Sequence, residues 1–578
     1  MAGSEPALPR FERRFFGADS PTRIGEGAIG GKAHGLVRAR RILGERLDPS
    51  RFRGLAVGIP RMVVLGTDVF DGFLAQNDLR DDPERTDDRI AQAFQQASLP
   101  VEVLGDLRAI VEETRLPLAV RSSSLLEDAL VRPFAGVYQT KMIPNFAPDA
   151  DTRFERLVEA VKFVYASTWF RSARDYARAA GCGGLDEKMA VIVQEVVGRR
   201  YDRRYYPLVS GVARSFHWYP MAPARPEDGV VHLALGLGKT IVDGGVCWAY
   251  SPSRPRAAPP FGSVADQLQG SQTTFWTIRL DRPAAYDPTA ETEYLVQLGL
   301  DAAEYDDTLR HVASTYDAAS DRLRPGTGRA GPRAVDFAPI LAWDEIPLNA
   351  LVRELLSVFA DELGTAVEIE FAVTIDEPPA GGAWFGLLQV RPMAALDEVV
   401  QVSDADLAHA AALVASERVL GNGVDTTITD VVYVLAERFD PLATRAMVGE
   451  IAARNRELVA AGRPYLLIGF GRWGSADPSL GIPVAWSDVG GARAIVEATL
   501  PHMNVEPSQG SHFFHNLSSF RVSYFMVHHA ERPIDWAWLA RQGVVAETEH
   551  VRHVRTSVPL SVRVDGRAGR GVILAGER

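Results

Sequence analysis

One segment alternates between large apolar residues and polar or small ones, which restricts it to a β-strand with one buried face, and a second strand-like segment follows it after a short turn. In AVEIEFAVTI, residues 366–375, Glu368 and Glu370 fall on one face of the strand. After the turn EPPAGG, the segment WFGLLQVRP places Gln389 and Arg391 on a common face. A hairpin of these two strands gathers two carboxylates, an amide and a guanidinium into one patch.

The chemistry of this patch leaves two interpretations open. Carboxylate and amide oxygens are ligands that suit Mg²⁺, and an arginine beside them suits a phosphate group. The same residues also form an ordinary exposed sheet face with an ion pair, and geometry alone favours that simpler interpretation. Residues elsewhere in the chain must decide between the two.

The whole chain is too long for one hydrophobic core, because 578 residues predict two to four domains. A net charge of −12 argues against broad nucleic-acid binding, which relies on a basic surface. The two cysteines, Cys182 and Cys247, are too few for a disulfide framework or a Cys-based zinc site, and they indicate a reducing cytoplasm. Neither secretion nor insertion into a membrane is expected from the apolar runs.

Apolar periodicity predicts alternating helices and strands. The predicted elements before residue 398 are a strand and a helix in 56–77, a strand at 116–120, a helix in 153–180, a strand at 189–197 and a helix in 351–364. Residues 252–290 are rich in Pro, Ser and Gln, which indicates a long connection or an insertion.

A domain boundary is predicted between Asp397 and Asp406, where the chain becomes acidic and loses its periodicity. The residues beyond it, 399–578, are expected to form a smaller α/β domain. Its predicted elements are a strand at 431–435, a helix in 441–459, a strand at 465–470 and two final strands in PLSVRVDGRAGRGVILAG.

The glycine-rich stretch LALGLGKTIVDGG contains Gly238-Lys239-Thr240, which is the tail of a P-loop. A P-loop requires a further glycine at position 233, where the sequence has leucine, and Gly244-Gly245 would interrupt the helix that follows a P-loop. We therefore reject a P-loop, although glycines packed this densely still indicate a special backbone turn.

Four segments, in order, resemble the nucleotide-binding half of phosphoenolpyruvate synthase and pyruvate phosphate dikinase, a relative of the ATP-grasp fold. They are GGKAHGL at 30–36, AVRSSSLLEDALVRPFAGVYQT at 119–140, GLGKTIVDGG at 236–245, and LLQVRP at 387–392 with IEF before it. The second is the most specific, because it resembles the family's VRSS segment, acidic pair and FAG in sequence. The resemblance implies a two-lobed, ATP-grasp-like domain over residues 1–398, so the expected fold combines α/β and α+β architecture.

Carried over residue by residue, the resemblance implies that Lys32 and Arg121 hold the phosphates of ATP. It also implies that Ser122, Ser123 and Ser124 belong to a loop over those phosphates. Without the resemblance, Lys32 reads as a solvated lysine at a helix start, and Arg121 as a surface ion pair at a strand end.

The resemblance further implies that Glu370 and Gln389 hold Mg²⁺, while Arg391 counters the charge on the transferred phosphoryl group. Gly236 and Gly238 would form a backbone turn beside the nucleotide. Phosphoryl transfer depends on positioning and charge stabilisation more than on covalent help from the protein, which agrees with these roles.

Lys239 departs from the family pattern, which has glutamate at that position. A negative charge has thereby become positive. Two consequences remain open: Lys239 adds a contact to phosphate, or the geometry around the nucleotide differs.

The complete enzymes of this family have a swivelling domain, whose histidine accepts phosphate, and a C-terminal barrel. Fewer than two hundred residues follow the nucleotide-binding region, against the roughly 250 of a (β/α)₈ barrel, so no barrel is expected here. GRWGSADPSLGIPVAW resembles the swivelling domain's glycine turn and LGIP, but it lacks the histidine. His512 in SQGSHFFHNLSSF is therefore a candidate phosphoryl acceptor, with a packed structural histidine as the alternative.

The expected function is that of a cytoplasmic, Mg-ATP-dependent phosphotransferase of the dikinase type. It would pass a phosphoryl group to a histidine or to an unidentified small-molecule or protein acceptor. The alternative is a non-catalytic ATP-sensing module that acts through a protein partner, and a third possibility is a scaffold that binds no nucleotide.

Overall fold

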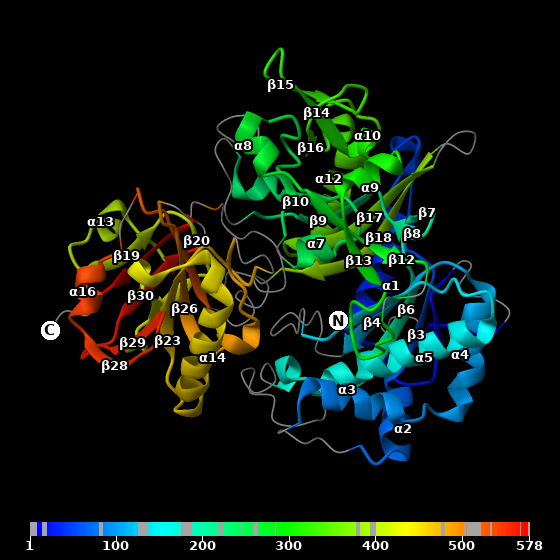
Figure 1. Cartoon of the computed structure of the whole chain (residues 1–578), viewed down its shortest axis with the longest axis horizontal. Coiled ribbons are helices and arrows are strands. Elements are labelled where there is room, and N and C mark those ends of the chain that lie inside the picture. The colour runs from blue at the N-terminus through cyan, green and yellow to red at the C-terminus, as the bar shows by residue number, and fades with distance from the viewer. Residues whose placement is uncertain are drawn as a thin grey trace.

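A computed structural model describes the chain except for residues 1–7, 14–19, 80–84, 125–136, 175–187, 218–223, 244, 258–263, 282, 284, 377–381, 394–399, 476–479, 502–504, 506–521, 532–533, 567 and 576–578. Figure 1 shows a first lobe in blue and cyan, a second lobe in green, and a C-terminal part that runs from yellow to red. Among the helices described, none combines the length and apolar character needed to cross a bilayer.

The first lobe is built on a five-stranded sheet of order β1-β3-β6-β4-β5. Its elements are β1 (Thr22–Ile24), α1 (Gly30–Arg46), β3 (Met62–Leu65), α2 (Thr67–Gln76), α3 (Asp87–Gln96), α4 (Val101–Glu113), β4 (Leu118–Ser124), β5 (Thr140–Ile143), α5 (Ala150–Ala166) and β6 (Met189–Glu195). Strand β3 is apolar throughout because both faces of the sheet are covered. Val63 and Leu65 pack with side chains of α2 to α5, while Met62 and Val64 pack with those of α1.

The second lobe is built on a six-stranded sheet of order β11-β10-β9-β17-β18-β2. Its strands are β2 (Leu55–Gly58), β9 (Val209–Arg214), β10 (Val230–Ala234), β11 (Trp248–Tyr250), β17 (Val367–Asp376) and β18 (Gly382–Pro392). Ile369, Phe371 and Val373 of β17 pack with helix α12 (Leu348–Leu363). Strands β17 and β18 pair antiparallel, which confirms the predicted hairpin.

Two smaller sheets complete the second lobe. They consist of β7 (Arg199–Tyr201), β8 (Arg204–Tyr206), β12 (Thr274–Arg279) and β13 (Leu295–Gly299), and of β14 (Ala313–Asp317), β15 (Arg322–Pro325) and β16 (Arg333–Val335). Residues 252–290, predicted to be a long connection or an insertion, contain β12, which joins β8 and β13. Helix α5 ends at Ala166, where the Ser167 hydroxyl donates to the Val164 carbonyl, so the helix predicted over 153–180 is interrupted. Residues 171–174 are helical again, and 175–180 lie outside the described residues.

Helix α1 packs on both lobes. At its start Gly30 has φ +76°, and a Cβ there would lie 1.7 Å from the Ser123 carbonyl oxygen of β4. Further along, a Cβ on Gly35 would lie 3.0 Å from the Val390 carbonyl oxygen of β18. Arg38 then donates to the Glu362 carbonyl at the end of α12. These close approaches explain why small residues begin this helix.

The C-terminal part contains a seven-stranded sheet of order β20-β27-β26-β23-β22-β29-β28 and a four-stranded sheet of order β19-β31-β30-β21. Its main elements are β19 (Ala412–Ser416), β20 (Val419–Leu420), β21 (Gly423–Asp425), β22 (Asp430–Val434), α14 (Thr444–Ala460), β23 (Tyr465–Phe470), β26 (Ala492–Ala498), β27 (Ser523–Val527), β28 (Gly543–Glu547), β29 (Val551–Arg555), β30 (Ser561–Asp565) and β31 (Arg570–Leu574).

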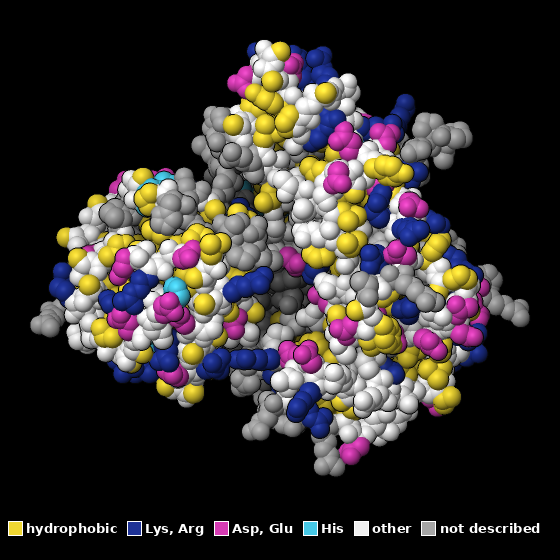
Figure 2. All heavy atoms as spheres, in the orientation of Figure 1, with side chains coloured by type: hydrophobic (Ala, Val, Ile, Leu, Met, Phe, Trp, Pro, Cys, Tyr) yellow, Lys and Arg dark blue, Asp and Glu magenta, His cyan; other side chains and the backbone are white. Residues whose placement is uncertain are grey.

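All strands of these two sheets follow Asp404, and they include both predicted final strands. The chain is therefore a mixed α/β protein, as predicted. The boundary proposed between residues 398 and 399 falls within 394–399, outside the described residues. In the space-filling view the surface is hollowed between the two lobes and the C-terminal part (Figure 2).

Candidate functional site

Two rows of polar side chains cross the second-lobe sheet, on the face opposite α12. In the first row Glu368 of β17 lies opposite Arg214 of β9 and Arg391 of β18. In the second row Glu370 lies opposite Gln389. Residues directly opposite one another in antiparallel strands project from the same side of a sheet. The hairpin therefore forms the polar patch that its alternation predicts.

In the first row one buried carboxylate binds two guanidinium groups. Arg214 Nε donates to Glu368 Oε2 over 2.5 Å, and Arg391 Nη2 donates to Glu368 Oε1. The three side chains are almost fully buried, at 11% exposed for Arg214, 4% for Glu368 and 5% for Arg391. Within this row, two cations therefore share one carboxylate.

The second row is reached by an arginine from the other lobe. Arg121 of β4 donates through Nη1 to the Leu388 carbonyl over 2.7 Å and through Nη2 to Gln389 Oε1 over 3.2 Å. Its Nη2 also lies 3.7 Å from Glu370 Oε2. A cation of the first lobe therefore directly contacts the carboxylate and amide oxygens of the second lobe, and the two lobes meet at this point.

Lys32 and the three serines lie beside that arginine. Lys32 Nζ donates to Ser122 Oγ over 3.2 Å. Ser123 Oγ accepts from the Ala33 amide and donates to the Ile29 carbonyl, which satisfies groups at the start of α1.

The prediction that Ser122, Ser123 and Ser124 form a loop was wrong. All three are buried in strand β4, which pairs with β6 along its whole length. Their hydroxyls are small enough to be buried against the first turn of α1, so a polar triplet continues the strand.

The glycine-rich segment forms the predicted backbone turn, and its lysine is paired. That this turn lies beside a nucleotide stays a prediction. Gly236 has φ +82°, and its carbonyl accepts from Ser210 Oγ of β9. Lys239 Nζ lies 3.2 Å from Asp243 Oδ2 and 3.5 Å from Glu291 Oε2. Burial by itself would lower the pKa of Lys239, but the two carboxylates outweigh this effect and raise the pKa.

Helix α7 (Lys239–Val242) follows Gly238 and has only four residues, so the rejection of a P-loop is confirmed. The predicted phosphoryl acceptor, His512, lies outside the described residues, and its role stays a prediction.

A buried ion pair joins the first lobe to the segment that precedes β13. Lys141 of β5 lies 2.9 Å from Glu293, with side chains 1% and 0% exposed. Lys141 also donates to the carbonyls of Pro288 and Ala290, each over 2.9 Å. Burial lowers the pKa of Lys141, against the opposing effect of Glu293.

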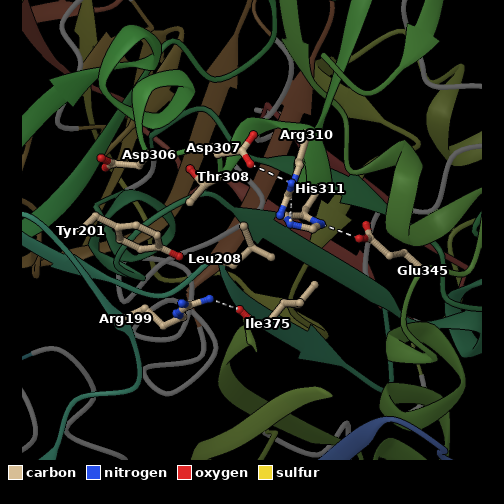
Figure 3. A pocket seen from close by; sticks show the side chains of 10 residues that line it. All are labelled: Arg199, Tyr201, Leu208, Asp306, Asp307, Thr308, Arg310, His311, Glu345 and Ile375. Atoms are coloured by element: carbon tan, nitrogen blue, oxygen red, sulfur yellow. Dashed lines mark hydrogen bonds and ion pairs between the residues drawn. The ribbon is translucent and has the colours of Figure 1, made fainter. Parts of the chain in front are cut away.

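A cavity of about 210 Å³ lies elsewhere in the second lobe, between β7, the end of β17, and the segment from Asp306 into α10 (Leu309–Val312), which follows α9 (Leu300–Tyr305). Figure 3 shows its charged side chains turned toward one another and toward the backbone. Arg310 pairs with Asp307, His311 pairs with Glu345, and Arg199 donates to the Ile375 carbonyl. Because these charges are already engaged, we assign the cavity no ligand.

Sequence reasoning missed Arg214, which pairs with a carboxylate 154 residues away along the chain. The one available signal was a charged residue at the end of the otherwise uncharged strand VSGVAR. Such a signal indicates that a partner is required, without saying which residue supplies it.

Comparisons with known proteins identify the family of this chain. The family described as pyruvate phosphate dikinase, AMP/ATP-binding domain, matches residues 26–409, a span that contains both rows as well as Lys32 and Arg121. A phosphoenolpyruvate synthase of Aeropyrum pernix is 28% identical over 285 residues, which cover 49% of this chain and 29% of that protein. The alignment therefore spans less than a third of that relative.

Proposed function

This chain belongs to the family of the pyruvate phosphate dikinase AMP/ATP-binding domain, and from that premise we propose that it is an Mg-ATP-dependent phosphotransferase. ATP binds between the two lobes, and its phosphates lie along Lys32, Arg121 and Arg391. The backbone at Gly236 and Gly238 flanks the nucleotide.

The observation that carries this proposal is the contact of Arg121 with Gln389 and Glu370 across the two lobes. Arginine binds phosphate through planar, paired hydrogen bonds. A cation from one lobe faces oxygen donors from the other, so the arginine and a metal ion on those oxygens would contact the phosphates of a nucleoside triphosphate from two sides.

Glu370 and Gln389 would hold the Mg²⁺, since both offer hard oxygen donors from adjacent strands. The bound metal would neutralise charge on the phosphates. Arg391 stabilises the negative charge that develops on the transferred phosphoryl group, and Lys32 with Arg121 orients the phosphate chain. The buried surroundings of Arg391 strengthen its electrostatic effect.

The acceptor is a histidine of this chain, with His512 as the candidate, or a separate molecule. The nucleotide product distinguishes a dikinase from a simple kinase. A dikinase releases AMP, whereas a simple kinase releases ADP.

The test is to incubate the purified full chain with Mg-ATP, with and without pyruvate, and to separate the nucleotides by chromatography. We expect AMP and an acid-labile phosphoprotein in wild type. In Arg391→Met we expect both to fall by about a hundredfold or more. Arg333→Met is the matched control, because Arg333 is another buried arginine of the same lobe, 13% exposed and paired with Glu304.

ADP in place of AMP would indicate a simple kinase on this scaffold. ATP recovered intact, with binding preserved, would overturn the catalytic proposal and favour the ATP-sensing module.

A further inference from the structure

Arg214 is a buried arginine in a strand of small and apolar residues. Every residue of β9, VSGVAR, is buried. Burying a guanidinium is costly unless it is paired and hydrogen-bonded. Glu368 is that partner. The pair lies on the face of the sheet opposite α12, called the cleft face below, beside the proposed phosphate site.

The strand order explains why Glu368 can serve two arginines. Strand β17 lies between β9 and β18, so Glu368 has Arg214 on one side and Arg391 on the other. Arg214 and Arg391 are two strand spacings apart, about 10 Å in backbone terms. Each takes a different oxygen of the same carboxylate. The carboxylate is therefore fixed from both sides, and it fixes Arg391 in turn.

The same contacts distinguish the two acidic residues of β17. Glu368 has both oxygens engaged by guanidinium groups, whereas Glu370 lies beside Gln389 and 3.7 Å from Arg121. The two carboxylates are one strand repeat apart, about 7 Å. A metal ion on Glu370 and Gln389 thus has the doubly paired Glu368 as its neighbour.

The charge of Arg214 also reaches beyond Glu368. Burial raises the pKa of the Cys247 thiol to about 11, and the positive charges of Arg472 and Arg214 oppose that rise. Cys247 packs with Val212, which lies on the cleft face of β9 two residues before Arg214.

We infer that Arg214 is a positioning residue for phosphoryl transfer: through Glu368 it fixes the guanidinium of Arg391 and keeps the Glu368 carboxylate off the metal. This inference rests on the proposed function. Without Arg214, Glu368 Oε2 loses its guanidinium partner, and the carboxylate that orients Arg391 is no longer held from both sides. The row then has one positive charge fewer beside the proposed phosphate site.

The experiment compares affinities for ATP and for AMP by titration calorimetry with Mg²⁺ present, using the full chain. The variants are Arg214→Met, Arg391→Met, their double variant and Arg214→Lys, with Arg333→Met as the matched control. AMP lacks the phosphates that the first row would contact. We expect Arg214→Met to weaken ATP binding by about ten- to a hundredfold while AMP binding changes by less than about threefold.

The double variant separates positioning from direct contact. If Arg214 acts through Arg391, the double variant binds ATP no worse than Arg391→Met alone, since effects on one network are not additive. Arg214→Lys should recover part of the loss, because it restores the charge.

A metal titration separates the two carboxylates. We expect Glu370→Gln to raise the Mg²⁺ concentration needed for half-maximal ATP binding by about tenfold or more, and Glu368→Gln to leave it within about twofold. In Arg214→Met the same midpoint should fall, because Glu368 is released.

Two results would overturn the inference: an ATP-to-AMP affinity ratio in Arg214→Met equal to that of Arg333→Met, or additive losses in the double variant. If the wild type binds nucleotide and the variants give either result, only the role of Arg214 is overturned. If the wild type binds neither nucleotide, the proposed function is overturned as well.

Discussion

Two lysines of the candidate site have different described contacts. Lys32 donates to the hydroxyl of Ser122, and Lys239 lies between the carboxylates of Asp243 and Glu291. The positive charge that replaces the family's glutamate is thus balanced locally. We therefore expect Lys239 to stabilise the glycine-rich segment and to contribute little to phosphate binding.

Substituting Lys239 tests that expectation. Lys239→Met should lower the free energy of unfolding by about 1 kcal/mol, the scale of a partly exposed ion pair. Lys239→Glu should cost more, because three carboxylates then lie together. ATP affinity should stay within about threefold of wild type in Lys239→Met. Denaturant unfolding and calorimetry measure the two quantities, and a large loss of affinity at unchanged stability would show a phosphate contact instead.

At the scale of elements, alternation predicted the β17–β18 hairpin and the shared face of its polar residues, because side chains two residues apart in a strand project from the same face. Alternation could not predict that Arg121 contacts Gln389, since that contact depends on how two sheets pack. The resemblance misled for Ser122–Ser124: it implied a loop over the phosphates, whereas the three residues are buried in strand β4.

Gly30 tests the docking of α1 on β4. Gly30→Ala forces a side chain into a backbone with φ +76° and against the Ser123 carbonyl. We expect a loss of about 2 kcal/mol or more of stability, together with weaker ATP binding, because Lys32 begins the same helix. Gly44→Ala is the control, since nothing lies within 4 Å of a Cβ there and alanine favours a helix by about 1 kcal/mol. Equal melting temperatures for the two variants would contradict the docking.

At the scale of the whole molecule, α1, Arg121 and the buried pair Lys141–Glu293 are among the described contacts that join the two lobes. The first two lie at the proposed site. Lys141 lies on β5, beside the strand that carries Arg121, but no pattern in the chain predicts its pairing with Glu293, because a lysine in a short strand is ordinary on a surface. Its burial is a product of the tertiary fold.

Removing one partner of that pair should destabilise the joined lobes. Lys141→Met leaves Glu293 buried without its cation, so we expect a loss of about 3–5 kcal/mol. The double variant Lys141→Met, Glu293→Leu should recover most of it, because no uncompensated charge remains. Thermal unfolding measures both. A single variant as stable as wild type would show that the pair does not join the lobes.

The path of the chain through the lobes has a practical consequence. It forms β1 in the first lobe, crosses to place β2 beside β18 in the second, returns for β3 to β6, and crosses again at β7. Any single cut that is meant to separate the two lobes therefore leaves a strand of one lobe on the fragment that carries the other lobe. A separately expressed piece beginning at β7 would have to bind residues 55–58 as a peptide to complete its sheet, so the two lobes should be recoverable only as complementing fragments.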